Sequence, residues 1–208
     1  HAPTRVEVVD LDLDGDPEIV VGSAAWSHDG QLQWQRPDLL DYRGSHYPTI
    51  ANLDDDPYPE LVRRSAGGQF VALNHDGSDL WSTTFPFGGV DFGILTIADV
   101  DNDGKAEVIV PGDNGSTIVR VLNGADGTIK WTQTVPGIEG NWGATVFDMD
   151  NDGFNEVIFL NTDRIVHVWD GRDGSVKLTY QTGETGRALQ TSLPIFADVD
   201  NDGHAEMV

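Results

Sequence analysis

Acidic side chains recur in this sequence at alternate positions of short loops. In the segment Asp99–Glu107, DVDNDGKAE, aspartates occupy positions one, three and five, and a glutamate occupies position nine. Alternate side chains of a tight loop can converge on one point, and the backbone carbonyl of Lys105 at position seven can complete a cage of oxygen atoms. Anions this close repel one another, so the spacing favours the binding of a hard divalent cation.

The same pattern occurs five times along the chain. The copies DLDLDGDPE, NLDDDPYPE, DVDNDGKAE, DMDNDGFNE and DVDNDGHAE begin at Asp10, Asn52, Asp99, Asp148 and Asp198. One such loop could be an ordinary polar turn, because Asp, Asn and Gly are common turn residues. Five aligned copies, which hold 21 of the 35 acidic residues, instead predict up to five metal sites.

Calcium fits this set of ligands better than other ions do. It accepts about 6–8 irregularly placed oxygen ligands, whereas magnesium requires octahedral geometry and zinc prefers His or Cys. The loops are not EF-hands, because position 12 of the first, third and fourth copies holds Val or Phe in place of a bidentate Glu. In the second copy, Asn52 replaces Asp and Pro57 replaces Gly, so we expect the site at Asn52–Glu60 to be the weakest, or empty.

A second pattern places these loops within larger repeats. Asp-Gly pairs follow the first four loops and begin at Asp29, Asp76, Asp126 and Asp173. Each pair predicts a hairpin, in which a type I′ turn would use the positive φ that glycine adopts without strain. We expect four strands in each repeat, which in the third are Leu95–Val100, Glu107–Pro111, Thr117–Asn123 and Ile129–Val135.

Repeats of this kind predict an all-β fold, a β-propeller of four-stranded antiparallel blades. The second strand is an apolar run in most copies, such as EVIFL, which is typical of a sheet covered on both faces. The repeats span about residues 1–47, 48–93, 94–142 and 143–191, and a partial fifth spans 192–208. We therefore expect 1–208 to be one propeller segment, cut from a longer polypeptide whose ring has about 7 or 8 blades, and the alternative is a four-bladed ring closed by the final half-hairpin.

The loops resemble the FG-GAP/VCBS repeats of integrin-α-type propellers, whose hallmark is Asp-x-Asp-x-Asp-Gly-x-x-Asp between the first two strands of a blade. Four of the five copies keep the glycine, and all five carry Glu where the family pattern has its last Asp. The resemblance covers the whole chain. It implies a calcium-binding propeller in which calcium rigidifies the fold and performs no chemistry.

The resemblance also implies which residues bind calcium. The side-chain ligands would be Asp10, Asp12, Asp14 and Glu18 in the first loop, Asn52, Asp54, Asp56 and Glu60 in the second, Asp99, Asp101, Asp103 and Glu107 in the third, Asp148, Asp150, Asp152 and Glu156 in the fourth, and Asp198, Asp200, Asp202 and Glu206 in the fifth. Position seven, whose carbonyl oxygen completes each cage, is occupied by Asp16, Tyr58, Lys105, Phe154 and His204.

Aromatic residues recur outside the loops. Trp34, Trp81 and Trp131 share one position of the expected fourth strand, where the fourth repeat has Leu178. Stacking on sugars is one interpretation, but aromatic residues repeated in each blade favour packing between neighbouring sheets. The connections between blades carry a second set, which could bind a ligand or fill the central channel: Tyr42, His46, Tyr47, Phe85, Phe87, Phe92 and Trp142.

Composition argues against several classes of function. A net charge of −23 disfavours binding to nucleic acid or to an anionic membrane, and no apolar run is long enough for membrane insertion as a helix. The chain has no cysteine, which excludes thiolate metal sites, cysteine nucleophiles and disulfides. No Ser-His-Asp arrangement and no phosphate-binding glycine loop stands out.

We therefore expect a non-catalytic binding, adhesion or scaffold module of a secreted or cell-surface protein, with an extracellular glycan or protein as its partner. Extracellular calcium modules bind with dissociation constants of about 10⁻⁴–10⁻³ M, which suits that location. One alternative is the propeller body of a secreted polysaccharide lyase similar to rhamnogalacturonan lyases, in which Arg63, Arg64 and Arg187 would recognise uronate carboxylates. Another is a self-associating matrix or fibre protein, because incomplete blades leave strand edges open.

Overall fold

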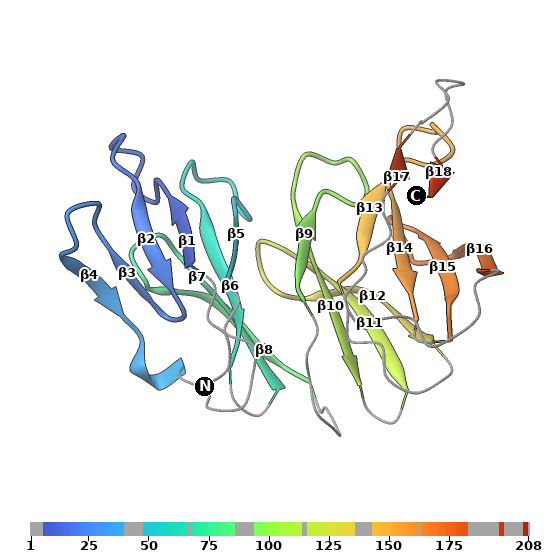
Figure 1. The fold of residues 1–208 in the computed structure, drawn as a ribbon, viewed down its shortest axis with the longest axis horizontal. Helices are drawn as coiled ribbons and strands as arrows, with labels where there is room; N and C mark the ends of the chain where they lie inside the picture. Colours follow the sequence, from blue (N-terminus) through green and yellow to red (C-terminus); the bar gives the residue numbers. More distant parts are fainter. Residues whose placement is uncertain are drawn as a thin grey trace. The chain divides into compact units, whose positions relative to one another are not determined.

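The structure is a computed structural model that describes residues 6–39, 48–65, 68–85, 94–113, 116–135, 143–161, 163–182, 196–197 and 206–207 (Figure 1). It contains four antiparallel sheets of four strands and one pair of short strands. A 3-10 helix, Pro37–Leu39, follows the first sheet. No helix in the described ranges has the length and apolar character needed to cross a membrane.

Each four-stranded sheet keeps the order of its strands in the chain, as the repeats predict. The first sheet contains β1 (Val6–Val9), β2 (Glu18–Val21), β3 (Ala24–Trp26) and β4 (Leu32–Gln35), and the second contains β5 (Thr49–Ala51), β6 (Glu60–Arg64), β7 (Gln69–Leu73) and β8 (Asp79–Thr84). The third contains β9 (Thr96–Ala98), β10 (Glu107–Asp113), β11 (Thr117–Asn123) and β12 (Ile129–Val135), and the fourth contains β13 (Thr145–Phe147), β14 (Glu156–Leu160), β15 (Ile165–Asp170) and β16 (Val176–Gln181). The short pair is β17 (Phe196–Ala197) and β18 (Glu206–Met207).

The chain divides into two compact units, 1–87 with 124–128 and 88–123 with 129–208. In the first, side chains of the first two sheets form one core: Leu11, Val20, Ala25, Leu39, Leu61, Val71 and Leu73. In the second, the third and fourth sheets share another: Val100, Ile109, Val119, Val121, Trp131, Val135, Ala144, Val157, Phe159 and Trp169. The apolar runs of β6, β10 and β14 are buried on both faces, as expected, whereas β2 alternates between buried and half-buried residues.

The Asp-Gly hairpins form where the sequence predicts them, but the predicted type I′ turn is wrong. Type I′ requires positive φ at both central residues, and only the glycines have it, at Gly30, Gly77, Gly127 and Gly174 (85°, 79°, 68° and 74°). In the first hairpin, Gly30 N–H donates to Ser27 O and Ser27 N–H donates to Gln31 O, both at 2.9 Å. The strand register shifts beside this turn, so the hairpin is a type I turn followed by a glycine bulge.

The tryptophans of the fourth strands pack against the hairpin of the following repeat. The indole N–H of Trp34 donates to His75 O (2.8 Å), that of Trp81 to Gly124 O (2.6 Å) and that of Trp131 to Gly171 O (2.7 Å). The packing interpretation is therefore confirmed for these three residues. Leu178, at the same position of β16, is 46% exposed.

Each of these indoles also covers the hairpin glycine of the repeat that it contacts. A Cβ added to Gly77, Gly127 or Gly174 would lie 2.7, 2.6 or 2.7 Å from an indole carbon, whereas a Cβ on Gly30 would meet nothing within 4 Å. Glycine is thus required twice at three of the hairpins, for its positive φ and for its missing side chain. At Gly30 only the first requirement applies.

The described acidic loops connect the first and second strands of the four-stranded sheets, and the backbones of loops one, three and four turn twice through the left-handed region. The glycine at position six has a φ of 96° at Gly15, 88° at Gly104 and 89° at Gly153. Position four is also left-handed, with φ of 61° at Leu13, 59° at Asn102 and 56° at Asn151. Asn tolerates this conformation and Leu does not, so Leu13 is strained.

Several residues singled out in the sequence lie outside the described ranges. They are Tyr42, His46, Tyr47, Phe87, Phe92, Trp142, Arg187 and the fifth loop from Asp198 to His204. Phe85 is described: it is buried, and its ring centroid lies 5.9 Å from that of Phe70. Phe85 therefore packs within the fold, and the filling of a central channel by the aromatic residues of the connections stays a prediction.

The two classes of hairpin glycine predict different costs of substitution. Gly30→Ala should lower the free energy of unfolding by about 1 kcal/mol, because only the left-handed backbone is strained. Gly77→Ala should lower it by about 1–3 kcal/mol more, because the new methyl group collides with Trp34. Urea denaturation of both variants measures the difference. Equal losses in the free energy of unfolding would show that Trp34 does not exclude a side chain at Gly77.

Leu13 offers a substitution that should stabilise the protein. Its side chain is 51% exposed, so Leu13→Asn removes little packing and places at position four the residue type that loops three and four already use. We expect the free energy of unfolding to rise by about 1 kcal/mol. Thermal denaturation checks this, with Leu32→Asn, which changes another exposed leucine, as the control that should show no gain.

Candidate metal-binding loops

Backbone N–H groups hold one oxygen of several loop aspartates. At position one, Oδ2 accepts the N–H of the glycine at position six, over 3.0 Å in loop one, 2.8 Å in loop three and 3.0 Å in loop four. At position five, Oδ1 accepts the N–H of position seven, over 2.8 Å in loops one, two and three and 2.9 Å in loop four. These bonds orient the carboxylates of the loops.

The glutamate at position nine closes each loop from inside the fold. Glu18, Glu60, Glu107 and Glu156 begin β2, β6, β10 and β14, and they are at most 2% exposed. In each, Oε2 accepts the backbone N–H of position two, at distances of 2.8, 2.7, 3.0 and 2.7 Å in loops one to four. The sequence does not reveal that this glutamate also binds the loop backbone. Because Oε2 accepts the backbone N–H, only Oε1 is left to face the other acids of the loop.

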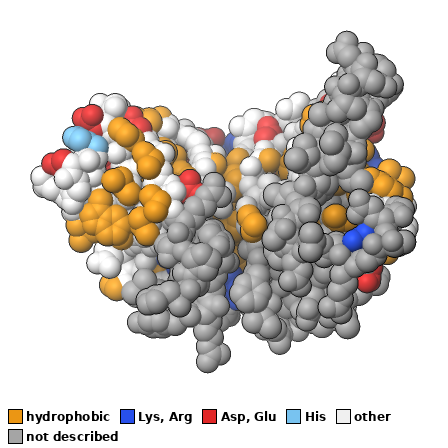
Figure 2. All heavy atoms as spheres, viewed as in Figure 1, with side chains coloured by type: hydrophobic (Ala, Val, Ile, Leu, Met, Phe, Trp, Pro, Cys, Tyr) orange, Lys and Arg blue, Asp and Glu red, His pale blue; other side chains and the backbone are white. Residues whose placement is uncertain are grey.

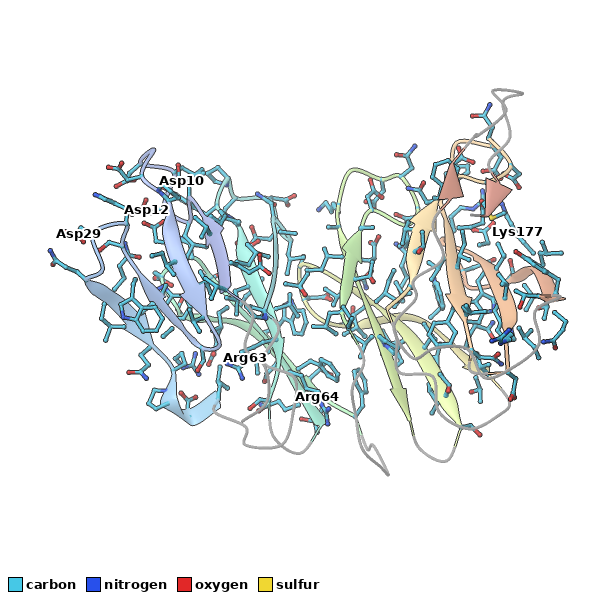
Figure 3. The ribbon with its side chains drawn as sticks, in the orientation of Figure 1. Asp10, Asp12, Asp29, Arg63, Arg64 and Lys177 are labelled. Carbon is cyan, nitrogen blue, oxygen red and sulfur yellow. The ribbon has the colours of Figure 1, made fainter. Side chains whose placement is uncertain are left out.

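Carboxylate oxygens converge in all four described loops, within 4.8 Å of one another. The groups are Asp10, Asp12 and Glu18, then Asp54, Asp56 and Glu60, then Asp99, Asp101 and Glu107, and lastly Asp148, Asp150 and Glu156. Figure 3 shows Asp10 and Asp12 on the loop between β1 and β2. The acids at position five of loops one, three and four are not part of these groups, and metal ligation by any of the residues named in the sequence stays a prediction.

Loop two reaches its geometry by a different path. Pro57 has no N–H for the residue at position one to accept, and the side-chain amide of Asn52 instead donates to the carbonyl oxygen of Asp56 at 2.5 Å. No residue from Asn52 to Glu60 has a positive φ. The two departures from the pattern therefore complement each other, since an aspartate at position 52 could not donate this bond.

Three carboxylate oxygens in the loops are buried without a hydrogen-bond partner among the described residues: Asp10 Oδ1, Glu60 Oε1 and Asp101 Oδ1. Burial raises the pKa of Glu60 to about 7 against the effect of the Leu53 N–H, and the nearby Asp54 and Asp56 raise it further. A buried anionic oxygen without a partner is costly. Convergent oxygens of this kind fit a hard divalent cation.

Basic side chains from the fourth strand enter two of the loops. The Lys130 ammonium on β12 donates to Asp101 and to Glu107 Oε1, the latter at 3.1 Å. The Lys177 ammonium on β16 (Figure 3) donates to Glu156 Oε1 at 2.6 Å, and to Asp150 and Asp152 at 2.9 and 3.3 Å. Although burial opposes the charge, the carboxylates hold the pKa of both lysines above its ordinary value. Sequence reasoning missed both residues.

Loops three and four are joined to each other. The side-chain amide of Asn102 donates to Gly153 O at 2.8 Å, and that of Asn155 donates to Asp99 O at 2.7 Å. Asn155 O in turn accepts the N–H of Gly171 at 3.0 Å, where a side chain would collide with the backbone. Loops three and four therefore form one hydrogen-bonded edge of the second unit.

Solved structures with a similar fold were found at low sequence identity. The Vibrio cholerae (V. cholerae) biofilm matrix protein Bap1 matches with a TM-score of 0.68 at 12% identity, over 98% of this chain and 59% of Bap1. BamB from Moraxella catarrhalis matches with a TM-score of 0.53 at 14% identity, over 85% of this chain and 48% of BamB. BBS1N, solved in complex with ARL6DN, matches with a TM-score of 0.59 at 18% identity, over 86% of this chain and 54% of BBS1N.

These likenesses establish the fold alone, that of a β-propeller, and the chain spans about half the length of the solved chains that it matches. No curated protein matches the sequence. The FG-GAP-like repeat family matches twice, at residues 99–159 and 148–208, and each match joins two successive acidic loops. The chain therefore belongs to the FG-GAP-like repeat family and has an all-β, propeller-type fold built from four-stranded antiparallel sheets.

Proposed function

We propose that the chain is a calcium-stabilised propeller segment that acts as a non-catalytic scaffold or adhesion module of an extracellular protein. The observation that carries this proposal is the recurrence of convergent, partly buried carboxylates at the same connection of four successive sheets. Three oxygens of these groups are buried without a partner, and a bound cation would satisfy them. Such a cation would tie the first strand of each sheet to the second.

Calcium suits the loops for chemical reasons. The converging side chains of each group are carboxylates, and neither thiolate nor imidazole belongs to any of the four groups. The loops also differ in shape, since loop two lacks the left-handed residues of the others. Calcium tolerates irregular oxygen cages, whereas magnesium demands near-ideal octahedral geometry. One ion type can therefore serve all four loops.

An extracellular location follows from the calcium proposal. Extracellular calcium modules have dissociation constants of about 10⁻⁴–10⁻³ M, which extracellular calcium can fill and resting cytosol cannot. The fold is shared with Bap1, a biofilm matrix protein, and this likeness supports a matrix or surface role. Hydrophobic side chains gather over the first sheet in Figure 2, and its exposed Val6, Val8 and Leu32 suit contact with a protein partner.

The polysaccharide lyase alternative gains no support from the described cations. Arg63 lies on β6 and is 2% exposed, so its guanidinium is not offered to a substrate at the surface (Figure 3). Arg64, the next residue, is half-buried. We therefore favour the scaffold function over pectin cleavage.

Calcium should raise the melting temperature, and chelation should lower it. At a free calcium concentration ten times the dissociation constant, each site contributes about 1.4 kcal/mol, which corresponds to a few degrees in a chain of this size. Differential scanning calorimetry in calcium, in magnesium and in EDTA measures the effect. We expect a large rise with calcium and a smaller one with magnesium.

A pair of aspartate variants tests where the ion binds. Asp10→Asn weakens the carboxylate group of loop one and should reduce the calcium-dependent rise in melting temperature. Asp29→Asn makes the same chemical change at an exposed hairpin aspartate outside that group and should leave the rise intact. Identical melting curves of the wild-type chain in calcium and in EDTA would refute the calcium proposal.

A further inference from the structure

The four loops allow an internal comparison at one atom, Oε1 of the glutamate at position nine. The residue that faces it comes from the fourth strand, immediately before the tryptophan position. In loop one, Gln33 Nε2 donates to Glu18 Oε1 at 3.3 Å, and in loop two the corresponding residue is Leu80, which has no side-chain donor. In loops three and four, Lys130 and Lys177 donate to Glu107 and Glu156.

The number of carboxylates that each lysine contacts differs between the two loops. Lys177 reaches three acids of loop four, and no carboxylate oxygen of that loop is buried without a partner in the described structure. Lys130 reaches two acids of loop three, which keeps one unpartnered oxygen on Asp101. Loop one has no lysine, and its unpartnered oxygen belongs to Asp10.

An ammonium group and a calcium ion cannot share these oxygens. Calcium sits about 2.3–2.6 Å from each ligand oxygen, in the space between the carboxylates that a lysine ammonium would have to leave. Like charges at such distances also repel strongly. A lysine attached to the same sheet stays at high effective concentration, so displacing it weakens the apparent affinity for the ion.

We propose that Lys130 and Lys177 are tethered cations that compete with calcium for loops three and four, so that loop one, which has the same Asp-x-Asp-x-Asp-Gly pattern and no lysine, fills first. The inference rests on the proposed calcium function and adds to it an order of loading. Loop four, with three carboxylates paired to Lys177, fills last. In the second unit, the two lysines thus hold the carboxylates of loops three and four together without an ion. In the first unit, loop one has no lysine and needs an ion to do this.

The test is to count calcium ions and measure their affinities by equilibrium dialysis and isothermal titration calorimetry. Lys177→Gln and Lys130→Gln should each tighten one site by about tenfold or more, because the competing charge is gone. Gln33→Lys should do the reverse and weaken the tightest site by a similar factor. Arg36→Gln is the control, since it also removes one positive charge, from an arginine paired with Asp38 and Asp79 outside the loops, and should leave the affinities unchanged.

The outcomes separate the two proposals. If neither the wild-type chain nor any variant binds calcium, the proposed function fails. If the wild-type chain binds calcium while the lysine variants and Gln33→Lys keep its affinities, the tethered-cation inference is overturned and the calcium function stands. Circular dichroism confirms that each variant is folded, and should a lysine variant unfold, Gln33→Lys decides the question alone because it leaves the lysines in place.

Discussion

Repulsion between carboxylates that the backbone brings together is the constraint on which the rest of the structure depends. Pairing of the first and second strands brings the acids of each loop close together, and the resulting repulsion opposes folding unless hydrogen bonds or cations offset it. Backbone N–H groups satisfy one oxygen of the loop aspartates, and the N–H of position two satisfies the buried glutamate. A lysine offsets part of the remaining charge in loops three and four, while one buried oxygen in each of loops one, two and three keeps no partner among the described residues. The stability of the sheets therefore depends on how the charge of the acidic loops is offset, as well as on the apolar cores.

The sequence predicts the strands and the acidic groups because both depend on local patterns. Strand bounds in the third sheet agree with those expected to within one or two residues, since the loops and hairpins on either side mark them. The turn type was missed because an Asp side chain can stabilise a type I turn: Asp76 Oδ1 accepts the N–H of Ser78 at 2.9 Å. The roles of Lys130 and Lys177 were missed because they depend on strand register, 29 and 27 residues from Asp101 and Asp150.

The fourth strand of a sheet contacts both the acidic loop of its own sheet and the hairpin of the following sheet. Successive side chains point to opposite faces of a strand, so Lys130 reaches the acidic loop of its own sheet while Trp131 donates to Gly171 of the following one. Gln33 and Trp34 repeat the arrangement in the first sheet. Adjacent residues of the fourth strand therefore contact the acidic loop and pack against the neighbouring sheet.

The hydrogen bonds that join loops three and four would couple the binding of an ion to one loop with the binding of an ion to the other. Asn102 and Asn155 each connect one loop to the other, so an ion that immobilised loop three would also order atoms of loop four. Linkage is reciprocal: whatever factor the first ion contributes to the affinity of the second, the second contributes equally to the first. If calcium fills these loops as proposed, this edge of the second unit would therefore bind its two ions cooperatively.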